Sequence, residues 1–249
     1  MKRILFSTKK KCNFGCKYCF SQLGDYDKYF YDKRKDYSGY DVLYPACDGE
    51  IDSINFKDLL DCIKSSNKPI IVAISTKMII NNKFLKEFTK LDKALKDNGG
   101  FLKIGITITS KNYLNVFESR AASFKDRMEN LKILKKNNIC CGVVIRPIIP
   151  FLPKEEFEYI IDSTKKIADY YLLGGLYVFK SSSFYKEYSD VLKDLKLMRV
   201  DWLKGKPKWY LAENITLNKA IEKYLKSNKL LYFNSDMDFV EYYRKNFKK

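Results

Sequence analysis

Short apolar runs alternate with amphipathic stretches along most of this chain of 249 residues. The expected strands are RILFST, DVLYPA, PIIVAIST, FLKIGITIT, CCGVVIRPIIP and YYLLGGLYVF, and helix-forming sequence separates most of them. This alternation is typical of right-handed βαβ units, which build a parallel sheet. Because most of the strands are apolar throughout, we expect both faces of the sheet to be covered.

About six such units are fewer than the eight that close a complete barrel. We therefore predict an α/β fold, an open and partial parallel β/α barrel with a binding site at the carboxyl ends of its strands. Residues 1–180 form the barrel core, and residues 181–249 form a mainly helical C-terminal extension that packs across one mouth. Gly99–Gly100 stands where a helix ends, and Ser123 with Asp126 approaches a capping box at a helix start.

Composition constrains the compartment and the partners. No apolar run reaches the ~18 residues that a membrane span needs, and the N-terminus lacks the apolar core and cleavage site of a signal peptide. We expect a cytoplasmic protein with no membrane partner, whose seven cysteines are not a disulfide framework. The net charge of +17 suggests a nucleic-acid partner. Because the lysines are spread along helices, a solvated surface explains that charge better, and a phosphate-bearing partner stays an alternative.

Three cysteines lie close together after the first expected strand, in a chain without histidine. Thiolates of Cys12, Cys16 and Cys19 form a soft-ligand site for zinc or for an iron–sulfur cluster. A structural zinc ion takes four protein ligands, and this sequence has no second CxxC pair. Among the other cysteines, only Cys47 is expected on the same side of the sheet. All four of those cysteines are interpreted first as small buried side chains.

The spacing CxxxCxxC after a strand, with Tyr18 before the last cysteine, resembles the radical S-adenosylmethionine (SAM) superfamily. This resemblance implies that Cys12, Cys16 and Cys19 bind a [4Fe–4S] cluster and that Tyr18 lies beside the adenine of SAM. In that superfamily the open iron chelates SAM, and one electron from the cluster cleaves it to a 5′-deoxyadenosyl radical. An electron donor such as flavodoxin or ferredoxin is then implied. The alternative from another class is a non-catalytic zinc-binding module.

Later motifs resemble the spore photoproduct lyase branch of that superfamily, over about residues 3–180. They are IVAISTK, GITITS, a Glu then an Arg before a helix, and RPIIP. By resemblance, Ser75 and Lys77 contact the methionine end of SAM, with Lys77 opposing its carboxylate. Thr109 and Ser110 would approach its amino group or ribose. Strand-end capping for the three hydroxyls and a surface position for the lysine are the alternatives.

Three further charged residues are candidates for the site. Glu118 and Arg127 fall at positions that this branch keeps, and either contact the ligands, with Glu118 catalytic and Arg127 binding the cofactor, or brace a helix start. Arg146 lies inside an apolar strand. Because a buried cation is costly without a partner, we expect Arg146 to face the barrel interior and meet a carboxylate or the substrate, as a catalytic candidate.

Further resemblance limits the class of substrate that we expect. Lyases of this branch that repair DNA use a cysteine beyond the barrel and a larger DNA-gripping region, whereas this chain has no cysteine after Cys141. The chain is similar to the queuine lyases of queuosine salvage, which cleave the cyclopentenediol from the 7-deazaguanine base queuine and release preQ1. This similarity implies C–N bond cleavage on a small modified nucleobase. The alternative is a radical enzyme that acts on DNA or tRNA.

A 7-deazaguanine base offers N–H donors and a flat face, so its pocket needs acceptors and aromatic rings. Stacking of a base on an aromatic ring is worth ~1–3 kcal/mol. We expect Asp48 and Glu50, after the second strand, to accept hydrogen bonds from the substrate, and we also count Glu50 as a catalytic candidate. Phe20 is the expected stacking partner, and Asp236 is a weaker acceptor candidate in the C-terminal region. Ordinary loop roles are the alternative for each of these residues.

Overall fold

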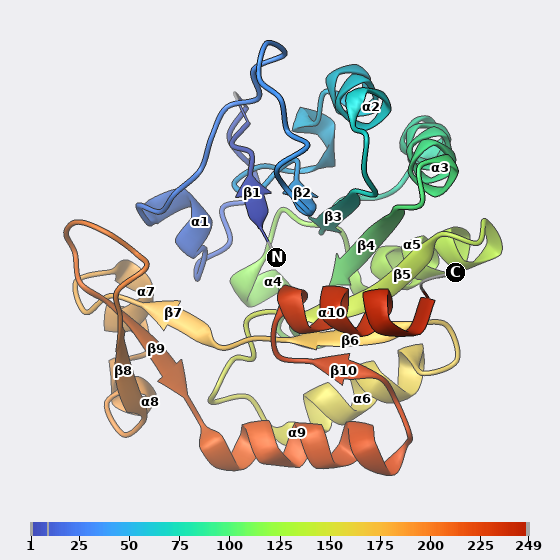
Figure 1. The fold of residues 1–249 in the computed structure, drawn as a ribbon. Helices are drawn as coiled ribbons and strands as arrows, with labels where there is room; N and C mark the ends of the chain where they lie inside the picture. Colours follow the sequence, from blue (N-terminus) through green and yellow to red (C-terminus); the bar gives the residue numbers. More distant parts are fainter. Residues whose placement is uncertain (1, 9, 248–249) are drawn as a thin grey trace.

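The computed structural model describes residues 2–8 and 10–247, and its main feature is a seven-stranded parallel sheet (Figure 1). The strand order is β1-β2-β3-β4-β5-β6-β10, and every neighbouring pair is parallel. The bounds are β1 Arg3–Leu5, β2 Val42–Tyr44, β3 Ile71–Thr76, β4 Phe101–Thr107, β5 Cys140–Ile145, β6 Tyr170–Leu173 and β10 Tyr232–Phe233. The predicted partial barrel is confirmed, with one strand more than the six expected.

Helices between the strands cover the outer face of the sheet (Figure 1). The longer ones are α2 Phe56–Ser65, α3 Asn82–Asp97, α5 Phe124–Lys136, α6 Lys154–Thr164 and α9 Ile215–Ser227. The shorter helices lie in the connecting loops or beside the antiparallel strands, and they are α1 Phe20–Leu23, η1 Ile51–Ser53, α4 Leu114–Phe117, α7 Ser183–Glu187 and α8 Ser189–Leu192. The capping box at Ser123 and Asp126 is present. Gly99 follows α3 with a φ of +68°, the left-handed conformation that glycine adopts at helix ends.

The inner face of the sheet is covered by α10, which spans Asp236–Phe247 and lies across the strands (Figure 1). Phe239 of α10 contacts Tyr170 with ring centres 4.4 Å apart, and it packs against Phe101 at 6.0 Å. The outer-face residues of the same strands, such as Leu102 and Ile104, belong to a separate core beneath the helices. Part of the C-terminal extension therefore packs across the barrel, as predicted.

The extension also contains a three-stranded antiparallel sheet, in the order β7-β9-β8, that the sequence did not predict. Its strands are β7 Leu176–Val178, β8 Lys196–Val200 and β9 Trp209–Glu213. The expected single strand YYLLGGLYVF is wrong, because Gly174–Gly175 divides it into β6 and β7. A Cβ atom at Gly174 would lie 2.6 Å from the Arg146 side chain, so only glycine fits where the chain leaves the parallel sheet.

The division at residue 180 stays a prediction, since β7 precedes it and pairs with β9 beyond it. No helix within residues 2–8 and 10–247 is both long and apolar enough to cross a bilayer.

Candidate functional site

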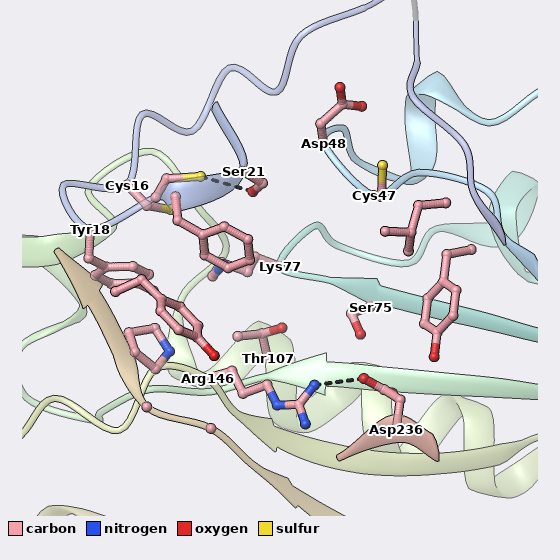
Figure 2. A pocket seen from close by; sticks show the side chains of 18 of the residues that line it. Cys16, Tyr18, Ser21, Cys47, Asp48, Ser75, Lys77, Thr107, Arg146 and Asp236 are labelled. Atoms are coloured by element: carbon pink, nitrogen blue, oxygen red, sulfur yellow. Dashed lines mark hydrogen bonds and ion pairs between the residues drawn. The ribbon is translucent and has the colours of Figure 1, made fainter. Parts of the chain in front are cut away.

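A cavity of about 890 Å³ lies at the carboxyl ends of the parallel strands (Figure 2). Its walls come from the loops after β1 and β2, from the ends of β3, β5 and β6, and from β9 and the start of α10. Most of the residues that the sequence nominated line this one cavity. They are Cys12, Cys16, Tyr18, Cys19, Phe20, Asp48, Glu50, Ser75, Lys77, Arg146 and Asp236.

The loop after β1 presents three free thiols, those of Cys12, Cys16 and Cys19, to the cavity. Gly15 has a φ of +57°, which lets the loop turn sharply between the first two cysteines. The N–H of Cys19 donates to the carbonyl of Cys16 at 3.0 Å, and the N–H of Lys17 donates to the carbonyl at the end of α4 at 3.0 Å. The loop is therefore fixed at both its turn and its outer edge.

Three thiolates on one loop are soft ligands, and this donor set fits an iron–sulfur cluster. Cys47 also lines the cavity, on the expected side of the sheet (Figure 2).

Tyr18 is held from behind by a buried network. Its hydroxyl donates to Oε1 of Glu118, and Oγ1 of Thr109 donates to the same oxygen at 2.7 Å. Oε2 of Glu118 forms an ion pair with Arg127 at 2.5 Å, with both side chains fully buried. Arg127 also donates to the carbonyl of Thr107 at 2.9 Å. Burial raises the pKa of Glu118 to about 6, although Arg127 acts in the opposite direction.

Four of the predicted ligand contacts are not what the structure shows. Thr109, Ser110, Glu118 and Arg127 lie behind the cavity wall, buried, and none of them lines the cavity. Glu118 and Arg127 pair with each other, and Arg127 also donates to the carbonyl of Ala122 just before α5, which is the bracing alternative given for that pair. Oγ1 of Thr109 donates to Glu118, and within the described residues Oγ of Ser110 has no hydrogen-bond partner, so neither hydroxyl caps a strand end as the alternative for them supposed.

Glu50 and Lys77, an acidic and a basic residue, both line the cavity beside the cysteine loop. Oε2 of Glu50 accepts from Oγ1 of Thr76 at 2.6 Å, and Oε1 accepts from the N–H of Lys77 at 3.3 Å. Burial raises the pKa of Glu50, and the charge of Lys77 opposes that rise. Nζ of Lys77 lies 5.8 Å from the ring centre of Tyr18. A cation and an aromatic ring thus face the same part of the cavity, with Ser75 on the same wall (Figure 2).

The floor of the cavity is an ion cluster centred on Asp236 (Figure 2). Nη1 of Arg146 donates to Oδ2 of Asp236 at 2.6 Å, and Nζ of Lys103 pairs with Oδ1. Burial alone would raise the pKa of Asp236, but the charges of Lys103 and Arg146 bring it down to about 2. The expectation that Arg146 faces the interior and meets a carboxylate is confirmed. Lys103 was missed, although a lysine inside the apolar run FLKIGITIT was a usable signal.

The three predicted substrate acceptors are already bonded to the protein. Asp48 accepts from Oγ of Ser7 at 2.5 Å and from the N–H of Thr8 at 3.0 Å, which braces the end of β1. Lys28 lies 3.2 Å from the same carboxylate. Glu50 and Asp236 are engaged as described above. Each of these carboxylates lines the cavity, yet each is first a structural acceptor.

Phe20 belongs to an aromatic wall that the sequence revealed only in part. Its ring meets Tyr177 edge to face at 5.2 Å, Trp202 at 5.5 Å and Tyr26, tilted, at 6.1 Å. The Trp202 side chain is 45% exposed, so part of this wall is open. Phe20 and Tyr26 belong to the segment after β1, whereas Tyr177 and Trp202 come from the C-terminal extension, so no local pattern links the two pairs.

The partial β/α barrel around the cavity is similar in fold to solved structures of spore photoproduct lyase. Its complex with a dinucleoside spore photoproduct has a TM-score of 0.65 at 15% identity, covering 93% of this chain and 76% of that one. A variant with bound AdoMet and the same dinucleoside has a TM-score of 0.64, 15% identity and the same coverage.

A second enzyme shares the fold. SuiB of Streptococcus suis, bound to the precursor peptide SuiA, has a TM-score of 0.56 at 12% identity, covering 94% of this chain and 48% of that one. No protein-family model matches this sequence, and a search of curated proteins finds no match. At these identities the likeness establishes the fold.

Proposed function

We propose that this chain is a radical SAM lyase whose Cys12, Cys16 and Cys19 hold a [4Fe–4S] cluster. The observation that carries the proposal is that three free thiols on one loop line the same cavity as Lys77 and Glu50. Bound there, the cluster and SAM supply a 5′-deoxyadenosyl radical. The AdoMet in a solved structure of the same fold supports this assignment.

The residues beside the cysteine loop bind and orient SAM. The ammonium of Lys77 pairs with the methionine carboxylate, because the cation already faces the cavity next to the Tyr18 ring. Tyr18 stays beside the cofactor because its hydroxyl is bonded to Glu118. Ser75 offers a hydroxyl from the adjacent strand.

As the substrate we propose the modified base queuine, whose C–N bond to the cyclopentenediol is cleaved to release preQ1. Three features support a small flat molecule. The cavity volume lies within the ~300–1,000 Å³ range of small-molecule sites, and the aromatic wall around Phe20 suits stacking. The ion pair between Arg146 and Asp236, at the start of α10, also forms part of the cavity lining.

Anaerobic incubation of the reconstituted protein with SAM and queuine tests this function. Mass spectrometry should detect preQ1, and queuine deuterated on its cyclopentenyl ring should pass deuterium to 5′-deoxyadenosine. A protein that cleaves SAM but never forms preQ1 or labelled 5′-deoxyadenosine would overturn the queuine assignment and leave the radical SAM assignment standing.

A nucleic-acid substrate is the second candidate, because the net charge is +17 and related structures hold a dinucleoside photoproduct. Binding to duplex DNA and to tRNA at several salt concentrations separates the two candidates. Submicromolar affinity that falls steeply with salt supports nucleic acid, and weak binding at all salt concentrations supports the free base. A colourless protein with one zinc per chain after anaerobic reconstitution would instead support the zinc-binding module.

We propose that the protein is cytoplasmic and receives its electron from a protein donor. An electron donor such as flavodoxin or ferredoxin would dock on a lysine-rich surface if it carries an acidic face. Reduction by either donor in place of dithionite, with 5′-deoxyadenosine as the readout, tests this partner.

A further inference from the structure

One carboxylate on the cavity wall has no hydrogen-bond or ion-pair partner among the residues that the structure describes. Five carboxylates line the cavity, those of Asp48, Glu50, Glu213, Glu222 and Asp236. The first, second and last are bonded as described above, and Oε1 of Glu222 accepts from Nδ2 of Asn234 at 3.2 Å. Within residues 2–8 and 10–247, the Glu213 carboxylate accepts no hydrogen bond, and no cation lies within 4 Å of it.

Strand β9 positions Glu213 toward the cavity. Side chains alternate along a strand, so Leu211 and Glu213 line the cavity while Ala212, between them, is buried in the core. Lys196 is the register partner of Glu213 on β8, yet the two side chains form no ion pair. The alternation, rather than a charged neighbour, fixes the direction of the carboxylate.

The neighbouring segment before β7 leaves room beside the Glu213 carboxylate. Gly175 carries no side chain, and Oε1 of Glu213 lies 3.6 Å from where a Cβ atom of Gly175 would stand. Tyr177 follows on β7 as the register partner of Leu211, and its ring contacts Trp202 at 5.2 Å. The acceptor therefore stands beside the aromatic wall, on the side of the cavity formed by the C-terminal extension.

We propose that Glu213 binds the donor edge of a guanine-type base. The inference rests on the proposed function and names the group that recognises its substrate. The ring N–H and the exocyclic amino group of such a base are adjacent, nearly parallel donors, which match the two oxygens of one carboxylate. A half-buried carboxylate without a partner is costly, and a flat base beside the Tyr177 and Trp202 rings provides both the donors and the stacking face.

The test compares 7-deazaguanine with 7-deazahypoxanthine, which lacks the amino group, by calorimetric binding to the reconstituted full-length chain. The unaltered protein should prefer 7-deazaguanine at least about 10-fold, because losing a charge-assisted hydrogen bond costs about that much affinity. Glu213→Gln should reduce that preference to about 2-fold. Glu222→Gln is the matched control, since its carboxylate lines the same cavity and already has a partner, and it should keep the full preference.

An equal preference in the unaltered protein and in Glu213→Gln would overturn the inference, as would no preference in the unaltered protein. Thermal unfolding confirms that the variants fold. If Glu213→Gln does not fold, Glu213→Asp, which keeps the charge but draws it back from the cavity, should show a reduced preference, and an unchanged preference would count against the inference. Loss of preQ1 formation with the base preference intact would refute the lyase function and leave Glu213 as a base-binding residue.

Discussion

The two walls of the cavity are built in different ways. On the N-terminal wall, the three thiols come from eight consecutive positions, and Glu50 and Lys77 follow the ends of adjacent strands. On the C-terminal wall, Arg146 meets an aspartate 90 positions further on, and the carboxylate of Glu213 arrives on an antiparallel strand. One wall is therefore encoded by residues close together in the sequence, whereas the other is assembled from distant segments of the chain.

Removal of one thiol from the N-terminal wall should abolish SAM cleavage. Cys16→Ser replaces a thiolate ligand with a hydroxyl, so bound iron should fall sharply and SAM cleavage should become undetectable. Iron analysis and the visible spectrum after anaerobic reconstitution measure this loss. Cys62→Ala is the control, because Cys62 is a buried residue of α2 that does not line the cavity, and this variant should retain its iron. Equal iron in both variants would contradict the assignment of the loop.

Loss of a charge on the C-terminal wall should lower the free energy of unfolding. Asp236→Asn leaves Lys103 and Arg146 without their shared counter-charge, which should lower the free energy of unfolding by about 3–5 kcal/mol. Urea denaturation measures the loss. Asp238→Asn, on the exposed face of α10, is the control and should cost less than about 1 kcal/mol. A similar loss in both variants would mean that the ion cluster does not hold the floor of the cavity.

The ion cluster at Asp236 also predicts that the stability of the fold depends on pH. The pKa of Asp236 is lowered from 3.8 to about 2 in the folded protein. A lowered pKa stabilises the fold above the unfolded value, and the stabilisation is lost as pH falls through the folded value. Urea denaturation between pH 5 and pH 2 should therefore show a decline in stability that is smaller in Asp236→Asn. An identical decline in both proteins would assign the acid sensitivity to other carboxylates.

The features that could be predicted from the sequence are those that depend on local patterns. The helices were predicted because their apolar positions repeat, and Cys12, Cys16 and Cys19 because their spacing is short. The pairing of Lys103 with Asp236 spans 133 positions, and only the folded sheet with α10 across it brings the two together. Thr109 was assigned to the cofactor by resemblance, and its hydroxyl is instead buried and donates to Glu118.

A change at Lys77 should weaken SAM binding without affecting assembly of the iron–sulfur cluster. Lys77→Met keeps most of the side-chain volume but removes the charge, so SAM affinity should fall about 10- to 100-fold, the value of a charge-assisted hydrogen bond. The iron content should not change. Equilibrium binding of SAM measures the effect, with Lys125→Met on the exposed face of α5 as the control. Unchanged affinity in Lys77→Met would remove Lys77 from the cofactor site.

The smallest expected effect is on the aromatic wall. Trp202→Ala removes one half-exposed ring, and base affinity should fall about 5-fold, near the lower limit for a stacked base. Calorimetry with 7-deazaguanine measures it. Phe30→Ala removes another exposed ring that does not line the cavity, so its affinity should equal that of the unaltered protein. If both variants lose affinity equally, the effect does not come from stacking in the cavity.

The position of α10 at the end of the chain has a consequence for biosynthesis. The cysteine loop leaves the ribosome early, whereas Asp236 follows more than 200 residues later. At ~5–20 residues per second, the interval is on the order of 10–40 s. Arg146 precedes Asp236 by 90 positions, so for about 5–18 s at the same rate Lys103 and Arg146 are both made but lack their counter-ion. The N-terminal wall is therefore complete in sequence well before α10 can cover the inner face of the half-barrel.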